Sequence, residues 1–159
     1  MKILVSACLL GVCCRYDGQS KANPVILALA GKHELIPVCP EQLGGLPTPR
    51  PPSEIREGRV VNSLGQDVTA QYQKGAAETL RLFALLKADL AILKARSPSC
   101  GCGQVYDGSF SSVLIPGDGI TAQLLKAHHI PVLTEENAIH FLMHADSNSD
   151  EGRAPTSAF

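Results

Sequence analysis

The chain opens with the stretch Lys2-Ile3-Leu4-Val5-Ser6-Ala7-Cys8, a short apolar run that ends in a cysteine. The same arrangement returns at Leu35-Ile36-Pro37-Val38-Cys39. It returns again at Leu90-Ala91-Ile92-Leu93, which is followed after a turn by Ser97-Pro98-Ser99-Cys100-Gly101. Short, continuous apolar runs bounded by turn residues are typical of strands buried in a parallel sheet. If the runs are parallel neighbours, the three thiols meet at one edge of the sheet, where open α/β folds bind their ligands.

Helical patterns lie between these runs. Apolar spacing and capping residues predict helices over residues 24–30, 68–88, from about 120, and from 135 to 145. Strands are predicted over residues 2–7, 34–38, 59–62, 89–94 and 130–133. The alternation predicts an α/β fold, a small Rossmann-like three-layer arrangement with a mostly parallel sheet of about four to five strands. We expect residues 1–145 to form a single domain and the polar residues 146–159 to form a flexible tail.

Two long segments read as loops. Residues 40–52 are rich in Gly and Pro, a composition that argues against helix or central strand. Residues 95–112 are rich in Ser and Gly and are predicted to form the second loop. Asp67 and Thr134 are the expected caps of the helices that come after them, and the strand at 59–62 is expected at the edge of the sheet.

Composition restricts the class of protein. The chain has 159 residues, a formal net charge of −1 and 45% hydrophobic residues, which suits one domain with a sizeable core. The near-neutral charge gives no reason to expect a nucleic-acid polymer or an anionic membrane as partner. No apolar run is long enough for a membrane span, so a cytoplasmic location is expected. There, the six cysteines are expected to be metal ligands, reactive thiols or buried residues rather than disulfides.

The cysteines are the first candidates for chemistry. Cys8, Cys39 and Cys100 at three strand ends favour a metal or cluster site with one open coordination position; the alternative is three small core residues. Three further cysteines could supply a fourth ligand or a sulfur-carrying thiol, or be buried without a role: Cys13, Cys14 and Cys102.

Polar residues accompany these cysteines. Glu41 follows Cys39 by two residues and could be a general acid or base, or a solvated loop carboxylate. Ser97 and Ser99 precede Cys100, where their hydroxyls could bind substrate or simply stabilise a turn. Three arginines in neighbouring loops could bind a phosphate or a carbonyl-rich ring, or lie on the surface: Arg15, Arg50 and Arg96.

The sequence resembles the DUF523 family, which includes the thiouracil desulfidases. Four blocks carry the resemblance, in the same order along nearly the whole chain: Ser6-Ala7-Cys8-Leu9-Leu10-Gly11 with Cys14-Arg15-Tyr16-Asp17-Gly18, Val38-Cys39-Pro40-Glu41, Gly44-Gly45-Leu46 with Pro49-Arg50, and Leu93-Lys94 with Ser97-Pro98-Ser99-Cys100-Gly101. The resemblance implies a [4Fe-4S] cluster held by Cys8, Cys39 and Cys100, and non-redox removal of sulfur. It further implies catalytic roles for Glu41 and the serines. Cys14 fits the family pattern, whereas Cys13 and Cys102 do not.

The resulting hypothesis is an iron-sulfur-dependent desulfidase. It would convert 2- or 4-thiouracil, or 4-thiouridine monophosphate, plus water into the uracil compound and sulfide. Arg15, Arg50, Arg96 and Ser99 would bind the substrate, which is a small molecule. The alternatives are a thiol or persulfide sulfur-transfer protein and a metal-binding module without catalysis; oligomeric state stays open.

Overall fold

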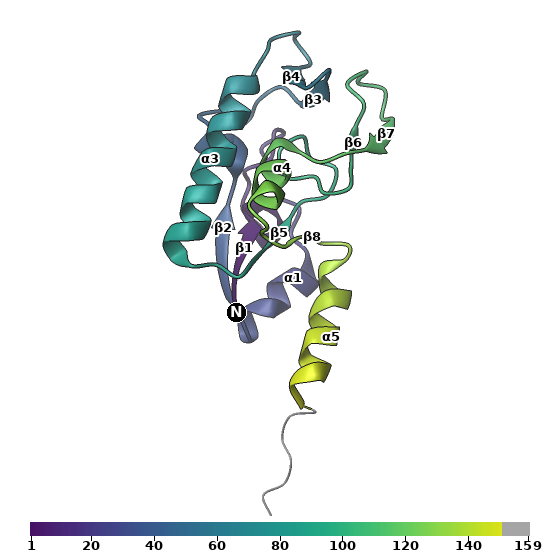
Figure 1. The fold of residues 1–159 in the computed structure, drawn as a ribbon. Coiled ribbons are helices and arrows are strands. Elements are labelled where there is room, and N and C mark those ends of the chain that lie inside the picture. The colour runs from purple at the N-terminus through teal and green to yellow at the C-terminus, as the bar shows by residue number, and fades with distance from the viewer. Residues whose placement is uncertain (151–159) are drawn as a thin grey trace, which may run out of the picture.

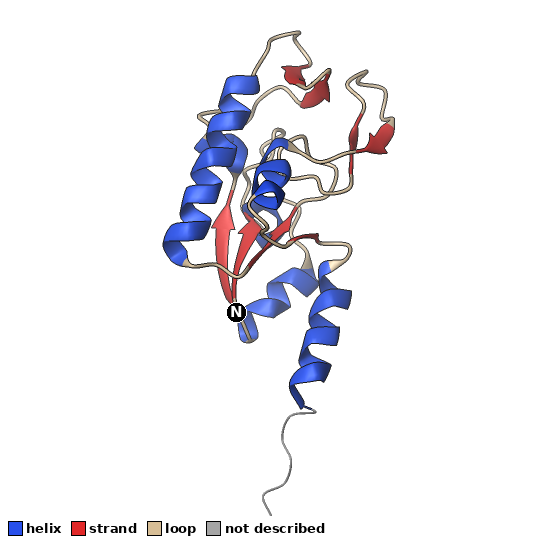
Figure 2. Ribbon diagram, in the orientation of Figure 1, coloured by secondary structure: helices blue, strands red, loops and turns tan. Residues whose placement is uncertain are grey.

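A computed structural model describes residues 1–150 of the chain. Its main sheet has four parallel strands in the order β2-β1-β5-β8 (Figure 2). These strands are β1 (Lys2–Ser6), β2 (Glu34–Val38), β5 (Leu90–Leu93) and β8 (Val132–Thr134). The two central strands, β1 and β5, are buried almost along their whole length, as continuous apolar runs in a parallel sheet should be. The predicted parallel α/β sheet is confirmed.

Helices cover both faces of this sheet and produce three layers (Figure 1). On one face lie α1 (Pro24–Ala28), with η2 (Leu29–Gly31) after it, and α5 (Ala138–Asp150). Their buried side chains meet those of alternate strand residues, in a core of Ile3, Val5, Ile26, Ile92, Ala138 and Leu142 among others. The other face carries α3 (Thr69–Leu86) and α4 (Ile120–Ala127), whose core includes Leu4, Ala91, Leu93, Ala122 and Leu125.

The register of the strands aligns their carboxyl ends. Ser6 pairs with Val38, the last residues of β1 and β2. On the other side of β1, Val5 pairs with Ile92, and Leu93 pairs in turn with Thr134. Because all four strands run in the same direction, the segments after them emerge at one edge. The cysteines after β1, β2 and β5 therefore converge, as the sequence predicted.

One segment differs from the sequence expectation. Residues 40–43, predicted as loop, form the short helix α2 (Pro40–Leu43) directly after Cys39. Proline at the first position of a helix is favourable because its fixed φ suits the helix and its missing N–H is not needed there. The glycine after α2 serves close contact with α3: a Cβ on Gly44 would overlap the backbone carbonyl of Gln71. The Gly and Pro residues thus permit a tight α2–α3 contact rather than an open loop.

Two small hairpins lie beyond the carboxyl edge of the sheet (Figure 1). The first pairs β3 (Ser53–Arg56) with β4 (Arg59–Asn62), so the strand predicted at 59–62 is not an edge strand of the main sheet. The second pairs β6 (Gln104–Tyr106) with β7 (Leu114–Pro116), which places a strand inside the predicted loop 95–112. Cross-strand pairing over these short segments decides their structure, and composition alone does not reveal it.

The helix ends differ from prediction in detail. Helix α3 begins at Thr69, and Asp67 accepts a hydrogen bond from the Thr69 N–H while Val68 occupies the cap position. Thr134 belongs to β8, residues 135–137 form a turn, and helix α5 begins at Ala138. It runs to Asp150, so the first residues of the predicted tail are helical, and the remainder, 151–159, lies outside the described residues. None of the helices within residues 1–150 has the length and apolar character needed to cross a membrane.

Candidate functional site

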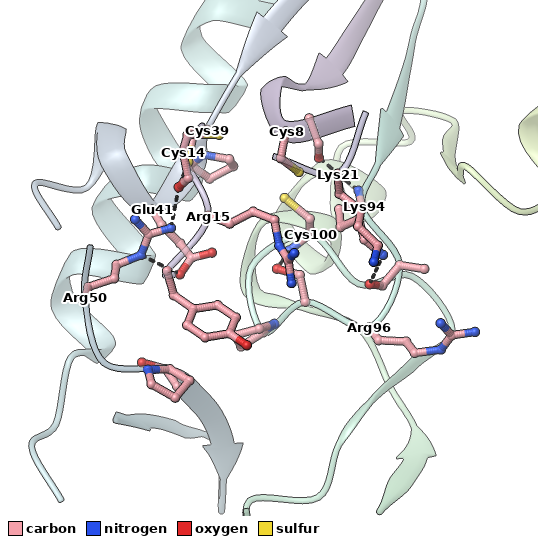
Figure 3. Close-up of a pocket in the computed structure, with 18 of the residues that line it drawn as sticks. Cys8, Cys14, Arg15, Lys21, Cys39, Glu41, Arg50, Lys94, Arg96 and Cys100 are labelled. Atoms are coloured by element: carbon pink, nitrogen blue, oxygen red, sulfur yellow. Dashed lines mark hydrogen bonds and ion pairs between the residues drawn. The ribbon is translucent and has the colours of Figure 1, made fainter. Parts of the chain in front are cut away.

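A pocket of about 460 Å³ lies at the carboxyl edge of the sheet, and Cys8, Cys39 and Cys100 all line it (Figure 3). Cys8 belongs to the 3-10 turn η1 (Ala7–Leu10) directly after β1. Cys39 is the residue between β2 and α2, and Cys100 follows β5 in the next loop. The three candidate ligands therefore come from three neighbouring strand ends and share one cavity.

Backbone hydrogen bonds fix the loop that carries Cys100. The Ser97 hydroxyl accepts bonds from the N–H groups of Ser99 and Cys100, at 3.1 and 3.0 Å. The first N–H groups of α4 donate to the carbonyls of this loop, for example Ile120 N to Pro98 O at 2.9 Å. A helix N-terminus has unpaired N–H groups, so docking the loop there satisfies both partners and holds Cys100 in place.

A fourth thiol, Cys14, lies among the ligands. It is buried, lines the pocket and interacts with both Cys8 and Cys39. The Cys39 thiol in turn faces the Cys14 carbonyl, with 3.8 Å between sulfur and oxygen. Cys13 is exposed and Cys102 points to the Val132 carbonyl, and neither lines the pocket. The geometry thus places Cys14 beside the site and Cys13 and Cys102 outside it.

Burial and neighbouring groups raise the pKa of three of these thiols, Cys14, Cys39 and Cys100. The contact with Cys14, together with burial, raises the pKa of Cys39. Burial, and the nearby Glu41 and Cys39, raise the pKa of Cys100 to about 12. At Cys14 the contact with Cys39 lowers the pKa, but Cys8 and burial raise it more, to about 11. Gathered thiolates repel one another unless a cation lies between them, so this donor set suits a metal centre whose binding displaces the protons.

The spacing of the donors bears on the kind of metal centre. Within residues 1–150, no three His, Cys, Asp or Glu side chains converge closely enough to surround a single metal ion. An iron-sulfur cluster binds each thiolate through a different iron atom, so its protein ligands stand further apart. Cys8, Cys39 and Cys100, which share one pocket, are the thiols that could hold such a cluster.

The carboxylate of Glu41 projects from α2 into the same pocket. Its Oε1 accepts a hydrogen bond from the Tyr72 hydroxyl at 2.6 Å and another from Arg50 Nε at 3.2 Å. Tyr72 lies in the segment 68–88, for which apolar spacing predicted only a helix, because nothing in the local sequence shows that α3 lies behind α2. Burial and the nearby Glu41 carboxylate raise the pKa of Tyr72. Its hydroxyl therefore keeps its proton and donates a hydrogen bond.

Arg50, predicted to bind substrate, is buried and bound to other protein groups. Its side chain is only 3% exposed. Besides Glu41, it donates to the carbonyls of Cys14 and Pro47 and to the Thr48 hydroxyl. Four of its N–H groups are thus taken by the protein, out of about five on a guanidinium. Arg50 connects Glu41 to the loop of Cys14 (Figure 3).

The two candidate serines have different positions. Ser97 lines the pocket, and its oxygen already accepts two backbone bonds, which leaves its own proton to donate. Ser99 does not line the pocket: it is 1% exposed and lies 3.1 Å from the Thr121 hydroxyl of α4. The structure therefore brings Ser97, and not Ser99, to the cavity.

Several cations surround the cavity. Arg15 and Arg96 line it as predicted, and they are paired with Asp17 and Glu136 respectively. Two lysines that sequence reasoning did not single out also line it. Lys94 donates to Glu135 at 2.6 Å, whereas the Lys21 ammonium has no ion-pair partner among the described residues. The family motif Leu93-Lys94 was the only sequence signal for Lys94.

Fold and site together define an α/β protein with a thiol-lined pocket at the carboxyl edge of a parallel sheet. The model of the 2-thiouracil desulfurase family matches residues 3–137. The chain belongs to this family, which confirms the resemblance inferred from its motifs. It is 43% identical over 143 residues to the uncharacterized protein YbbK of Bacillus subtilis (strain 168), a match that covers 84% of this chain and 95% of YbbK.

A solved structure is similar along most of the chain. It is the [4Fe-4S]-dependent thiouracil desulfidase TudS (DUF523Vcz), with a TM-score of 0.85 and 44% sequence identity. The match covers 91% of this chain and 97% of TudS. The Rossmann-like three-layer arrangement expected from the sequence is thus shared with a protein of that family.

Proposed function

We propose that this protein is a desulfidase, which converts a thiolated pyrimidine and water into the oxo-pyrimidine and hydrogen sulfide. The observation that carries the proposal is the convergence of Cys8, Cys39 and Cys100 on one pocket that also holds the Glu41 carboxylate. Membership of the 2-thiouracil desulfurase family and the similarity to TudS support it. The proposed substrates are 2- or 4-thiouracil and 4-thiouridine monophosphate.

Cys8, Cys39 and Cys100 are the residues we assign to a [4Fe-4S] cluster. When bound through three thiolates, such a cluster supplies an iron with an open position, a Lewis acid with affinity for sulfur. Cys14 lies next to these ligands, and its carbonyl is fixed by Arg50. We assign it no ligand role, because three thiolates already leave the open position that the reaction requires.

Glu41 is the proposed general base. Both of its hydrogen bonds fall on Oε1, and its Oε2 has none within residues 1–150. Oε2 is therefore the atom that accepts a proton from the attacking water. The water oxygen forms a bond to the ring carbon, the carbon–sulfur bond breaks, and sulfur leaves as sulfide. Carbon keeps its oxidation state, so the reaction needs no external electron donor.

Ser97 and the cations of the pocket are the proposed substrate contacts. The Ser97 hydroxyl can donate its proton to an exocyclic oxygen of the pyrimidine, since its oxygen is occupied by backbone N–H groups. Arg15, Arg96 and Lys21 line the pocket, where a phosphate would find cations. Their presence favours a nucleotide among the proposed substrates.

The test is turnover by protein purified and loaded without oxygen. We would supply 4-thiouracil, 2-thiouracil, 4-thiouridine and 4-thiouridine monophosphate separately. Loss of the thiocarbonyl absorption should accompany the appearance of one oxo-pyrimidine and one sulfide per substrate. An iron-loaded preparation that releases neither product from any of these compounds would refute the proposed function.

A further inference from the structure

The two small hairpins are hydrogen-bonded to each other, and both contribute residues to the lining of the pocket. The Arg56 guanidinium of β3 donates through Nε and Nη2 to the Gly108 carbonyl, at 3.0 and 2.6 Å. Glu54, on the same strand, accepts the N–H groups of Gly108 and Phe110 on Oε1, both at 3.1 Å. The turn after β6 is thus held on both its carbonyl and its amide side by β3.

Glycine is required at the point of contact. Gly108 is buried with a φ of +92°, and a Cβ at this position would lie 2.6 Å from the Ile55 carbonyl oxygen. Beyond it, Phe110 and Ser112 have positive φ values of 57° and 59°. Non-glycine residues adopt this conformation at a cost, and they keep it where surrounding contacts impose it. The tip of the second hairpin is therefore a fixed structure rather than a loose loop.

Aromatic side chains contribute to the lining of the pocket beside these hairpins. The chain has three tyrosines, four phenylalanines and no tryptophan, yet Tyr16, Tyr106 and Phe110 all line the pocket. Phe110 lines the pocket and is also 36% exposed to solvent. A partly exposed aromatic ring at a pocket mouth offers a face on which a flat heteroaromatic ring can stack.

We propose that Phe110 contacts the pyrimidine ring of the substrate, and that Arg56 and Glu54 are positioning residues that hold Phe110 there through Gly108. The inference rests on the proposed function, because a pyrimidine is the ring that the pocket would receive. The second hairpin then closes one side of the site. Its aromatic tip selects for planar rings, while the thiols and Glu41 act on the sulfur at the opposite end.

Kinetics give the first test. Phe110→Ala should raise KM about tenfold, the size of a base–aromatic stacking contribution, while kcat changes little; Phe110→Tyr should restore the KM. Arg56→Gln should raise KM in the same direction. The matched control is Arg59→Gln, in the neighbouring strand, whose ion pair with Asp67 lies away from the pocket. Unchanged KM in both Phe110→Ala and Arg56→Gln would overturn the proposal.

Binding gives a readout that needs no turnover. Because the chain lacks tryptophan, Phe110→Trp introduces a single tryptophan fluorophore beside the pocket. Its emission, excited where uracil does not absorb, should change saturably when uracil is added. Phe141→Trp on the exposed face of α5 is the control and should not respond.

The two measurements separate the two proposals. A wild-type enzyme that turns over, with a Phe110→Trp variant that does not respond to uracil, overturns the role of Phe110 alone. A fluorescence response at residue 110 in a protein that releases no sulfide supports the ring contact and refutes the desulfidase. Neither response nor turnover refutes both.

Discussion

Replacing Arg50 with methionine tests whether this residue stabilises the site or binds substrate. The substitution removes the cation from the Arg50–Glu41 pair, whose side chains are 3% and 18% exposed. It also removes the Arg50 N–H donors from the carbonyls of Cys14 and Pro47. Tyr72 still donates to Glu41, which limits the damage.

The magnitude can be worked out from these contacts. Removing one partner of a buried ion pair costs about 3–5 kcal/mol, and the lower end applies because Glu41 keeps a donor and some contact with solvent. We therefore expect the free energy of unfolding to fall by about 3 kcal/mol, or Tm by roughly 6–12 °C for a chain of this size.

Thermal unfolding followed by circular dichroism measures the change. The control is Arg59→Met, because its pair with Asp67 is 61% and 46% exposed and should contribute less than about 1 kcal/mol. If Arg50→Met is as stable as the control but raises KM for a phosphorylated substrate, Arg50 binds substrate. Its assignment as a residue that stabilises the site is then wrong.

Four further substitutions test the site and the helix contact behind it. Tyr72→Phe should lower kcat about tenfold with little change in KM, because Glu41 loses a charge-assisted hydrogen bond; an unchanged kcat would remove Tyr72 from the mechanism. Ser97→Ala should reduce turnover more than Ser99→Ala. The main effect of Ser99→Ala should be a loss of about 1 kcal/mol of stability. A larger loss of turnover in Ser99→Ala, measured in steady-state assays, would contradict the placement of Ser97 rather than Ser99 in the pocket. Gly75→Ala should destabilise the protein by about 1–3 kcal/mol or more in urea unfolding, since its Cβ would overlap the Pro40 carbonyl.

The sheet and its cysteines were predictable from sequence for a physical reason. Strands buried on both faces need continuous apolar runs, so β1 and β5 are visible without any tertiary information. Because the strands share one direction, the loops at their carboxyl ends emerge at the same edge of the sheet. The convergence of Cys8, Cys39 and Cys100 is a consequence of that topology.

The remaining parts of the site depend on contacts between distant segments. Helix α2 was missed because Pro40 and the glycines after the helix resemble a loop until α3 is known to lie against it. The role of Tyr72 depends on a bond to Glu41, 31 residues away. Arg56 and Gly108 are 52 residues apart in the sequence, so no local pattern reveals the hydrogen bonds between them. The division into one domain over 1–145 and a tail stays a prediction.

The most direct test of the cluster assignment is the iron and sulfide content of single cysteine variants, reconstituted without oxygen. We predict about four irons and four sulfides per chain in the wild type and in Cys13→Ala and Cys102→Ala, as a [4Fe-4S] cluster requires. Cys8→Ala, Cys39→Ala and Cys100→Ala should each lose most of both. A wild type without iron, or a Cys39→Ala variant loaded as fully as the wild type, would contradict the central claim that these three thiols hold the cluster.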